Sequence, residues 1–338
     1  MSIRVLVVDD SMICREMLTE LLQRQGDIQV VGRARNGKEA IELSRKLQPE
    51  LITMDIQMPG MDGFTAIEEI LALQPVPILV VTSSPVHHGE DRSFRALAAG
   101  ALDLVRKPEL EGPLAEQLRQ KVRTLAGVRV VRRIRRRSDA FSPVAAGREK
   151  ERSIVAIAAS TGGPRVLLEL LGDVSCHHPC SFLLTQHIPE GFCAGFAEWL
   201  NEELALDVSL ARDGEGLRPG RLLVAPTGFH LSLRAGKVVR LSDDPPDDNH
   251  RPSASYMFRS LAASHGPQTV GIVLTGMGRD GALGLLELRR AGGLCIAQDE
   301  ASSLVFGMPR AAVELQAAER VMDIAAMKQL LLRLQRTR

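Results

Sequence analysis

The chain has 338 residues, of which 45% are hydrophobic, and its 42 Lys and Arg against 41 Asp and Glu give a formal net charge of +1. This length can build two aliphatic cores, and a chain so close to neutral has no general attraction for a polyanion such as nucleic acid. Five cysteines, an odd number spread over both halves, favour reduced thiols and a cytoplasmic location over a disulfide framework.

The amino terminus shows no targeting pattern. Met1 leads directly into an apolar strand that ends in acidic residues, which is unlike a secretory signal. No apolar run approaches the length of a membrane span, so we expect no membrane insertion.

Short apolar strands alternate with helical patterns over the first 125 residues. We expect strands at 3–8, 51–54, 78–81 and 102–105, and helices at about 11–20, 38–47, 64–73, 91–99 and 114–125. This alternation is typical of a doubly wound parallel sheet.

Polar residues follow four of these strands. Asp9 and Asp10 end the first strand and Asp55 ends the second, so three carboxylates are expected at one sheet edge. Such acids can simply cap helices, but a cluster of them is unstable without a hard cation, and Mg²⁺ prefers oxygen ligands. Thr82 and Lys107 follow two later strands and offer a hydroxyl and an ammonium to phosphoryl oxygens. Asp55 is therefore the candidate phosphoacceptor.

Arginines crowd the segment that comes next, and little of it is apolar. We expect an interdomain linker at about 127–152, with arginines at 129, 132, 133, 135, 136 and 137. A solvated connector is the plain interpretation, and attraction to an acidic protein surface or to anionic lipid is the alternative. Nucleic acid is disfavoured because neither the single Trp nor the single Tyr lies here to stack on bases.

Three polar residues each follow a strand pattern in the second half. Ser160 follows the apolar run 154–157, His187 follows 182–185, and Asp280 follows 270–275, with helical patterns at 166–171 and 282–288. Because ligands bind at the carboxyl ends of strands in open α/β sheets, we expect the three to converge on one edge. Serine, histidine and aspartate are the parts of a nucleophile, its base and the group that orients the base, which predicts a hydrolase.

Each of these residues also has an ordinary structural interpretation, as a helix N-cap, a polar loop residue or a turn former. Ser160 lies in an Ala-x-Ser-x-Gly pattern, with Ala158 where an esterase nucleophile elbow has glycine. The chain order Ser, His, Asp also differs from the familiar triad orders, which favours a convergent site on another fold.

A cysteine and histidine cluster, Cys176-His177-His178-Pro179-Cys180, precedes the strand of His187. We interpret it as a polar loop and not as a zinc site, because no second ligand pair at a suitable spacing follows.

Residues 1 to about 125 resemble a two-component receiver domain. The resemblance rests on the acid pair, on Asp55 with the following Met58-Pro59-Gly60-Met61-Asp62-Gly63, on Thr82, and on Lys107-Pro108. It implies a flavodoxin-like fold in which Asp55 takes phosphate from a histidine kinase. It also implies Mg²⁺ held by Asp10, Asp55 and the carbonyl of Gln57, with Asp9 acting mainly through water. Receivers usually have an aromatic residue where this chain has Leu104.

With the second half included, the chain resembles the chemotaxis response regulator protein-glutamate methylesterases. The motifs that carry this are Ala159-Ser160-Thr161-Gly162-Gly163-Pro164, Gln186-His187-Ile188-Pro189, Leu274-Thr275-Gly276-Met277-Gly278-Arg279-Asp280-Gly281-Ala282 and Phe306-Gly307-Met308-Pro309-Arg310. The resemblance implies hydrolysis of glutamate γ-methyl esters on chemoreceptors with release of methanol, and often deamidation of receptor glutamines. It implies Ser160 as nucleophile, His187 as base, Asp280 as its orienter, and the amides of Thr161 and Met277 as oxyanion donors.

We therefore expect two doubly wound parallel-sheet α/β domains. A flavodoxin-like receiver is expected at 1–126, the linker at 127–152 and an α/β esterase domain at 153–338. The expected cofactor is Mg²⁺ in the receiver, and none is expected for ester hydrolysis. The expected partners are the cytoplasmic domain of a methylated chemoreceptor and a histidine kinase. A first reaction step needs a neutral His187, so activity is expected to fall as pH drops through the histidine range.

Two other classes of protein share part of this pattern. A DNA-binding response regulator would account for the receiver and the arginines, but its helical reader has no use for glycine-rich strand ends. A catalytically idle adaptor that holds a receptor or a kinase would use the same surfaces and release no methanol.

Overall fold

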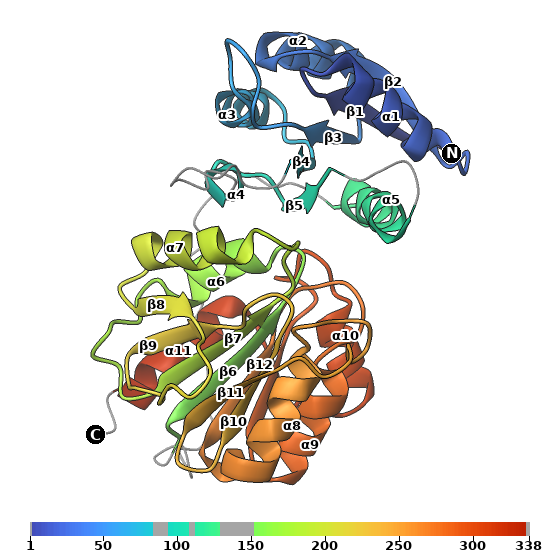
Figure 1. Ribbon diagram of the computed structural model, residues 1–338. Helices are drawn as coiled ribbons and strands as arrows, with labels where there is room; N and C mark the ends of the chain where they lie inside the picture. Colours follow the sequence, from blue (N-terminus) through green and yellow to red (C-terminus); the bar gives the residue numbers. More distant parts are fainter. Residues whose placement is uncertain (1, 84–93, 108–111, 129–151, 336–338) are drawn as a thin grey trace. The chain divides into compact units, whose positions relative to one another are not determined.

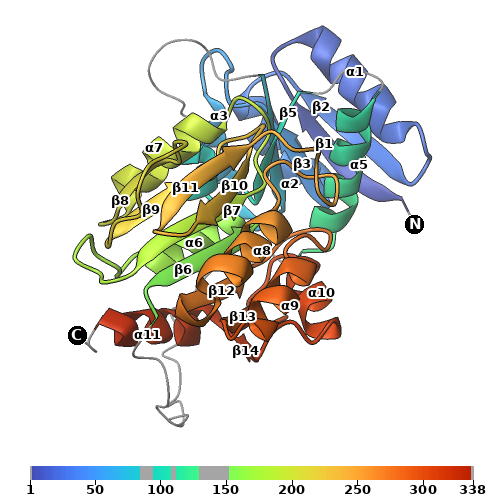
Figure 2. The ribbon, with the colours of Figure 1, turned by 60° about the horizontal axis from the view of Figure 1, so that its bottom comes forward.

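The computed structural model describes residues 2–83, 94–107, 112–128 and 152–335. The chain divides into two compact units, Met1–Arg135 and Arg136–Arg338, each of which has its own sheet (Figures 1 and 2). The linker expected at 127–152 falls mainly on residues 129–151, which lie outside the described residues.

The first unit contains a five-stranded parallel sheet in the order β2-β1-β3-β4-β5. Its strands are β1 (Ile3–Val8), β2 (Ile28–Ala34), β3 (Leu51–Met54), β4 (Ile78–Thr82) and β5 (Asp103–Arg106). Its helices are α1 (Met12–Gln23), α2 (Gly37–Leu47), α3 (Gly63–Leu73), α4 (Arg95–Ala98) and α5 (Pro113–Ala126). Every residue of β3 and β4 is buried, as expected for central strands covered on both faces.

Polar side chains set the first residues of three helices in this unit. Ser11, Asn36 and Asp62 each accept a hydrogen bond from a main-chain N–H three residues further on. Such caps satisfy amides that have no partner inside the helix. The Asp62 cap starts α3 directly after the loop that follows Asp55.

The second unit contains a seven-stranded parallel sheet in the order β14-β13-β12-β6-β7-β9-β8. Its strands are β6 (Ile154–Ala159), β7 (Ser181–Gln186), β8 (Asp207–Leu210), β9 (Arg221–Val224), β12 (Thr269–Val273), β13 (Leu294–Gln298) and β14 (Arg320–Met322). Strands β10 (His230–Arg234) and β11 (Val238–Ser242) form a separate antiparallel hairpin.

Helices cover both faces of this second sheet. They are α6 (Gly163–Leu171), α7 (Cys193–Glu203), α8 (Ala254–His265), α9 (Ala282–Arg290), α10 (Met308–Glu314) and α11 (Ile324–Gln335), with a 3₁₀ turn at Gly266–Gln268. Figure 2 shows α6 and α11 on one side of the sheet and α8 and α9 on the other. The main core lies under α8, α9 and the hairpin, and includes Leu231, Val239, Met257, Phe258, Leu261, Leu285 and Leu288.

Each sheet has one topological switch point, a pair of neighbouring strands from which the chain continues toward opposite edges of the sheet. In the first unit it lies between β1 and β3, and in the second between β6 and β12. Ligands of open α/β sheets bind at the carboxyl end of such a switch point. The fold thus directs attention to the residues that follow these four strands.

The expected α/β fold with two parallel sheets is confirmed, and the predicted strands and helices agree with the structure to within a few residues. The predicted helix at 91–99 is represented by the short α4, and its first residues lie outside the described ones. The hairpin β10–β11 was missed, although its turn has a clear signal in Gly236, whose φ is +79°. In the described parts of the chain, no helix is long and apolar enough to cross a membrane.

Candidate active site and acidic cluster

Three neighbouring strands of the second sheet, β12, β6 and β7, end beside one another and lead to Asp280, Ser160 and His187. The main-chain N–H of Ser160 donates to the carbonyl of Thr275 at 3.1 Å. The N–H of His187 donates to the carbonyl of Ala159 at 3.0 Å. The ladder hydrogen bonds therefore continue past the strand ends and hold Ser160 and His187 at the switch point.

His187 and Asp280 form a hydrogen-bonded pair. Nε2 of His187 lies 2.9 Å from Oδ2 of Asp280, and the aspartate is fully buried. The same carboxylate accepts the hydroxyl of Ser253 at 2.8 Å and the main-chain amides of Ala254 and Ser255 at 2.7 and 3.0 Å. These amides belong to the start of α8, where a negative charge is favoured.

This environment keeps Asp280 ionised. Burial acts to raise the pKa of Asp280, but the hydrogen bond from His187 and the amides of Ser255 and Ala254 outweigh it and hold the pKa well below its ordinary value. A carboxylate that stays charged and fixed can orient an imidazole and stabilise its protonated form.

The other nitrogen of the His187 ring, Nδ1, is buried and has no hydrogen-bond partner in the part of the chain that the structure describes. Since Nε2 faces a carboxylate, the tautomer that fits has its proton on Nε2 and a bare lone pair on Nδ1. Nδ1 is therefore the ring atom able to accept a proton. No hydrogen bond joins it to the Ser160 hydroxyl among the described residues, and such bonds are often long before substrate binds.

A second imidazole covers the first. The rings of His187 and His250 stack with centroids 3.9 Å apart and planes 10° apart. Burial, and then the electrostatic interaction with His187, lower the pKa of His250, which favours the neutral form of the covering ring. His250 itself is fixed by a hydrogen bond between Nδ1 and the carbonyl of Asp248.

The turn that contains Ser160 is tightly held. Ser160 is 8% exposed, and its carbonyl accepts the amide of Gly163 and Nε2 of Gln186, each at 2.8 Å. Gly162 takes a left-handed conformation with φ +79°, which lets the chain turn from β6 into α6. Ala158, directly under this turn, is fully buried in the sheet.

The loop after β12 approaches the same turn closely. A Cβ at Gly276 would lie 2.7 Å from Cβ of Ser160 and 2.4 Å from Sδ of Met308, so this position requires glycine. The carbonyl of Gly276 accepts the amides of Gly307 and Met308 at 3.1 and 2.9 Å. The Phe306–Arg310 segment singled out in the sequence thus holds the loop that contains Met277.

The cysteine and histidine cluster at 176–180 is part of the packing. His178 is fully buried, with Nε2 bonded to the carbonyl of Leu331 and Nδ1 accepting the amide of Cys180. Both ring nitrogens are therefore used in hydrogen bonds to main chain, in line with its interpretation as a loop.

In the first unit, carboxylates of Asp9, Asp10 and Asp55 lie within 4.8 Å of one another at the switch point. Nζ of Lys107 contacts Asp9 at 2.7 Å and Asp55 at 2.6 Å. Burial is the main cause that raises the pKa of Asp9. For Lys107, burial acts to lower the pKa, but the hydrogen bonds to Asp55 and Asp9 outweigh it and raise the pKa.

The residues around this cluster lie where the sequence placed them. Thr82 is buried at the end of β4, and its carbonyl accepts the amide of Lys107 at 2.8 Å. Gln57, which is exposed, has its main-chain N–H 3.4 Å from Oδ1 of Asp55. Three acidic oxygens of this kind form a donor set that suits Mg²⁺.

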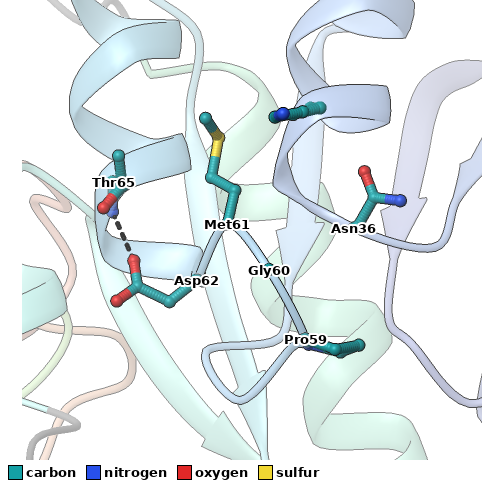
Figure 3. A pocket seen from close by; sticks show the side chains of 7 residues that line it. Asn36, Pro59, Gly60, Met61, Asp62 and Thr65 are labelled. Carbon is teal, nitrogen blue, oxygen red and sulfur yellow. Dashed lines mark hydrogen bonds between the residues drawn. The ribbon is translucent and has the colours of Figure 1, made fainter.

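The loop that follows Asp55 folds back on it. A Cβ at Gly63 would lie 2.3 Å from the carbonyl oxygen of Asp55, so only glycine fits there. Figure 3 shows a pocket beside this loop, where Oδ1 of Asp62 accepts the main-chain N–H of Thr65. The pocket is lined by Asn36, Lys38, Pro59, Gly60, Met61, Asp62 and Thr65.

Sequence reasoning missed the side chains of three residues that contact the Ser160, His187 and Asp280 group, namely Ser253, His250 and Gln186. Ser253 had a detectable signal, because a serine before a helical pattern is a typical N-cap. His250 lies in a polar loop with no such signal. Gln186 was quoted next to His187, but its contact with Ser160 depends on the pairing of β6 with β7.

Comparisons with known proteins agree with this organisation. The family model for the CheB methylesterase matches residues 155–331, and the model for the response regulator receiver domain matches residues 5–119. Protein-glutamate methylesterase/protein-glutamine glutaminase 2 of Anaeromyxobacter dehalogenans (strain 2CP-C) is 46% identical over 95% of this chain and 94% of that protein. A protein of the same name from Pseudomonas aeruginosa is 42% identical over 96% of this chain and 94% of that protein.

One solved structure is similar to the second unit. The catalytic domain of the Thermotoga maritima CheB methylesterase matches with a TM-score of 0.53 and 35% identity, covering 54% of this chain and 98% of that structure. The chain belongs to the CheB methylesterase family and has a response regulator receiver domain in its first unit.

Proposed function

We propose that this protein hydrolyses glutamate γ-methyl esters on chemoreceptors, releases methanol, deamidates receptor glutamines, and is regulated by phosphorylation. One observation carries the chemistry: a buried, ionised Asp280 holds His187 at the end of the strand next to the one that ends at Ser160. The names of relatives that match over nearly their whole length agree with this substrate class.

The proposed reaction is acyl transfer in two steps. Nδ1 of His187 takes the Ser160 proton as the hydroxyl attacks the ester carbonyl, and the protonated ring then gives a proton to the leaving methanol. Water attacks the acyl-enzyme with the same nitrogen as base. Asp280 keeps the ring in the tautomer with Nε2–H and stabilises its positive charge.

The amides of Thr161 and Met277 are the proposed oxyanion donors. In a planar trans peptide the C=O of one residue points opposite to the N–H of the next. The Ser160 and Gly276 carbonyls are each held by two hydrogen bonds inside the protein. These hydrogen bonds therefore also fix the direction of the N–H groups of Thr161 and Met277, as an oxyanion site requires.

In the first unit, Asp55 is the proposed phosphoacceptor. Asp10, Asp55 and the carbonyl of Gln57 would hold Mg²⁺, and Asp9 would act on it mainly through water. When bound at these residues, Mg²⁺ would neutralise negative charge on the carboxylate and phosphoryl oxygens. Lys107, which already bridges Asp9 and Asp55, and Thr82 would respond to the phosphoryl group. The proposed domain limits are 1–126 for the receiver and 153–338 for the esterase.

The proposed partners are a histidine kinase as phosphodonor and the cytoplasmic part of a methylated chemoreceptor as substrate. The direct test measures methanol released from receptor that has been labelled at its methyl esters. Wild type should release methanol, and Ser160→Ala should release none while keeping a wild-type melting temperature. An idle adaptor would bind the receptor in both forms and release methanol in neither.

A further inference from the structure

We propose that Gln186 is a positioning residue that aims the Thr161 amide at the oxyanion by holding the carbonyl of Ser160. Gln186 is the last residue of β7, is paired with Ala159 and is 3% exposed. Its Nε2 donates to the Ser160 carbonyl at 2.8 Å and to the His187 carbonyl at 3.2 Å. One amide group therefore ties together the main chain of the nucleophile and of the base. This inference rests on the proposed esterase function.

The link from Gln186 to the oxyanion passes through one peptide group. The carbonyl of Ser160 and the N–H of Thr161 lie in the same plane and point in opposite directions, so a rotation that frees one also turns the other. Gln186 and the amide of Gly163 are the two groups that hold this carbonyl. If one of these two hydrogen bonds is lost, the peptide group can rotate, and the Thr161 N–H then points away from the oxyanion position.

The second proposed donor lacks this dependence on a side chain. The Gly276 carbonyl, which shares a peptide group with the Met277 amide, is held by the main-chain amides of Gly307 and Met308. Those donors belong to the main chain. The two halves of the oxyanion site are thus built differently, and only the Thr161 half depends on a hydrogen bond from a side chain.

The Gln186 side chain makes its two hydrogen bonds at a cost to the stability of the fold. Because two carbonyls face its nitrogen, the orientation of the amide is fixed, and Oε1 is left buried with no partner in the described residues. An unsatisfied buried oxygen costs free energy that an apolar side chain would avoid. Gly163 makes room for it, since a Cβ there would lie 2.2 Å from Oε1. The glutamine thus lowers the stability of the fold through its buried Oε1, while its Nε2 donates hydrogen bonds to the carbonyls of Ser160 and His187.

The test compares Gln186→Met, which keeps the shape and removes both donors, with Thr185→Val as a matched control. Thr185 is the preceding residue on β7, is fully buried, and its hydroxyl contacts Met257. For Gln186→Met we expect kcat for methanol release to fall about 10- to 100-fold with KM within about twofold, since a misaimed donor costs less than a deleted one. Affinity for phenylboronic acid, whose tetrahedral adduct places an oxygen in the same site, should fall in parallel. Thr185→Val should change neither value by more than about twofold.

Gln186→Glu supplies a readout that a purely structural role would not move. An ionised glutamate repels the carbonyls of Ser160 and His187, whereas a protonated one can again donate a hydrogen bond. The ratio of mutant to wild-type kcat should therefore rise as pH is lowered. A ratio that is flat with pH, together with an unchanged kcat in Gln186→Met, would overturn the proposal.

Further outcomes separate this inference from the esterase assignment. If wild type releases no methanol, the proposed function fails, and the boronate and pH comparisons are not needed. If wild type is active and Gln186→Met loses kcat only in proportion to folded protein, measured by its melting curve, Gln186 is structural and the inference is wrong. Should Gln186→Met not fold, Gln186→Asn, which keeps the amide one methylene shorter, must show the kcat and boronate losses, or the inference is wrong.

Discussion

The Asp280→Asn variant tests the central pair of the site most directly, because it removes the charge and keeps the shape. In the structure Oδ2 accepts from His187 and Ala254, and Oδ1 accepts from the Ser253 hydroxyl and from the main-chain amides of Ser255 and Gly281. An amide has only one acceptor oxygen, so whichever way it turns, its NH₂ group faces at least one main-chain N–H.

The magnitude follows from this arrangement. One buried N–H left without an acceptor costs about 1–3 kcal/mol, which is a fraction of the 5–15 kcal/mol that stabilises a typical domain. The variant should therefore fold with a lower urea midpoint. If the amide oxygen turns to serve Ala254, it still cannot stabilise a protonated His187 as a carboxylate does, and kcat should fall by about 10³-fold or more, equivalent to about 4 kcal/mol of barrier.

Methanol release and urea unfolding are measured on the same preparation, with Asp247→Asn as the control. Asp247 also bonds the Ser253 hydroxyl and pairs with Arg259, but it does not touch His187. We expect less than a tenfold loss of kcat in Asp247→Asn. Equal losses in the two variants, or a loss below tenfold in Asp280→Asn, would refute the role given to the His187–Asp280 pair.

Four further predictions concern the site of Ser160, His187 and Asp280 and the acidic cluster around Asp55. Because the pKa of folded Asp280 lies below its unfolded value of about 3.9, its stabilisation is present above that value and lost as pH falls further, so the urea midpoint of wild type should drop more steeply below pH ~4 than that of Asp280→Asn. His250→Ala should lower kcat several-fold while His250→Phe, which can keep the stack, should not, and equal effects would exclude stacking as the cause. Gly276→Ala should leave the receiver intact but reduce kcat at least 10-fold, since its Cβ cannot fit beside Ser160, and a normal kcat would contradict the close approach. Asp55→Asn should abolish any stimulation of methanol release by acetyl phosphate with Mg²⁺, and stimulation that survives would move the phosphoacceptor elsewhere.

The fold was predictable because the strands at the centre of each sheet are short, mostly apolar runs. The β6 residues Ile154–Ala159 and all of β4 are buried, and such runs are typical of central parallel strands. Some of the strands that escaped prediction are amphipathic, such as β8, where only one of the four residues Asp207–Leu210 is buried. Their hydrophobic pattern does not differ from that of a loop.

Placement of the candidate site could be anticipated for the same reason, because a residue that follows a parallel strand must lie at a known edge. Ser160, His187 and the acids at positions 9, 10 and 55 needed only that rule. The atom that each residue uses could not be anticipated. Only the structure shows that His187 faces Asp280 with Nε2 and keeps Nδ1 without a partner.

Contacts that depend on the register between strands lie beyond sequence reasoning altogether. Gln186 reaches the Ser160 carbonyl because Ala159 pairs with Gln186, and a shift of one residue would turn the glutamine to the opposite face of the sheet. Ser253 and His250 reach the site from a loop more than 60 residues beyond His187, through the start of α8 and a stacked ring. The side chains that hold the nucleophile, the base and the carboxylate therefore come from two segments that are far apart in the sequence. For this reason we expect substitutions at Gln186 and Ser253 to affect kcat out of proportion to their effect on stability.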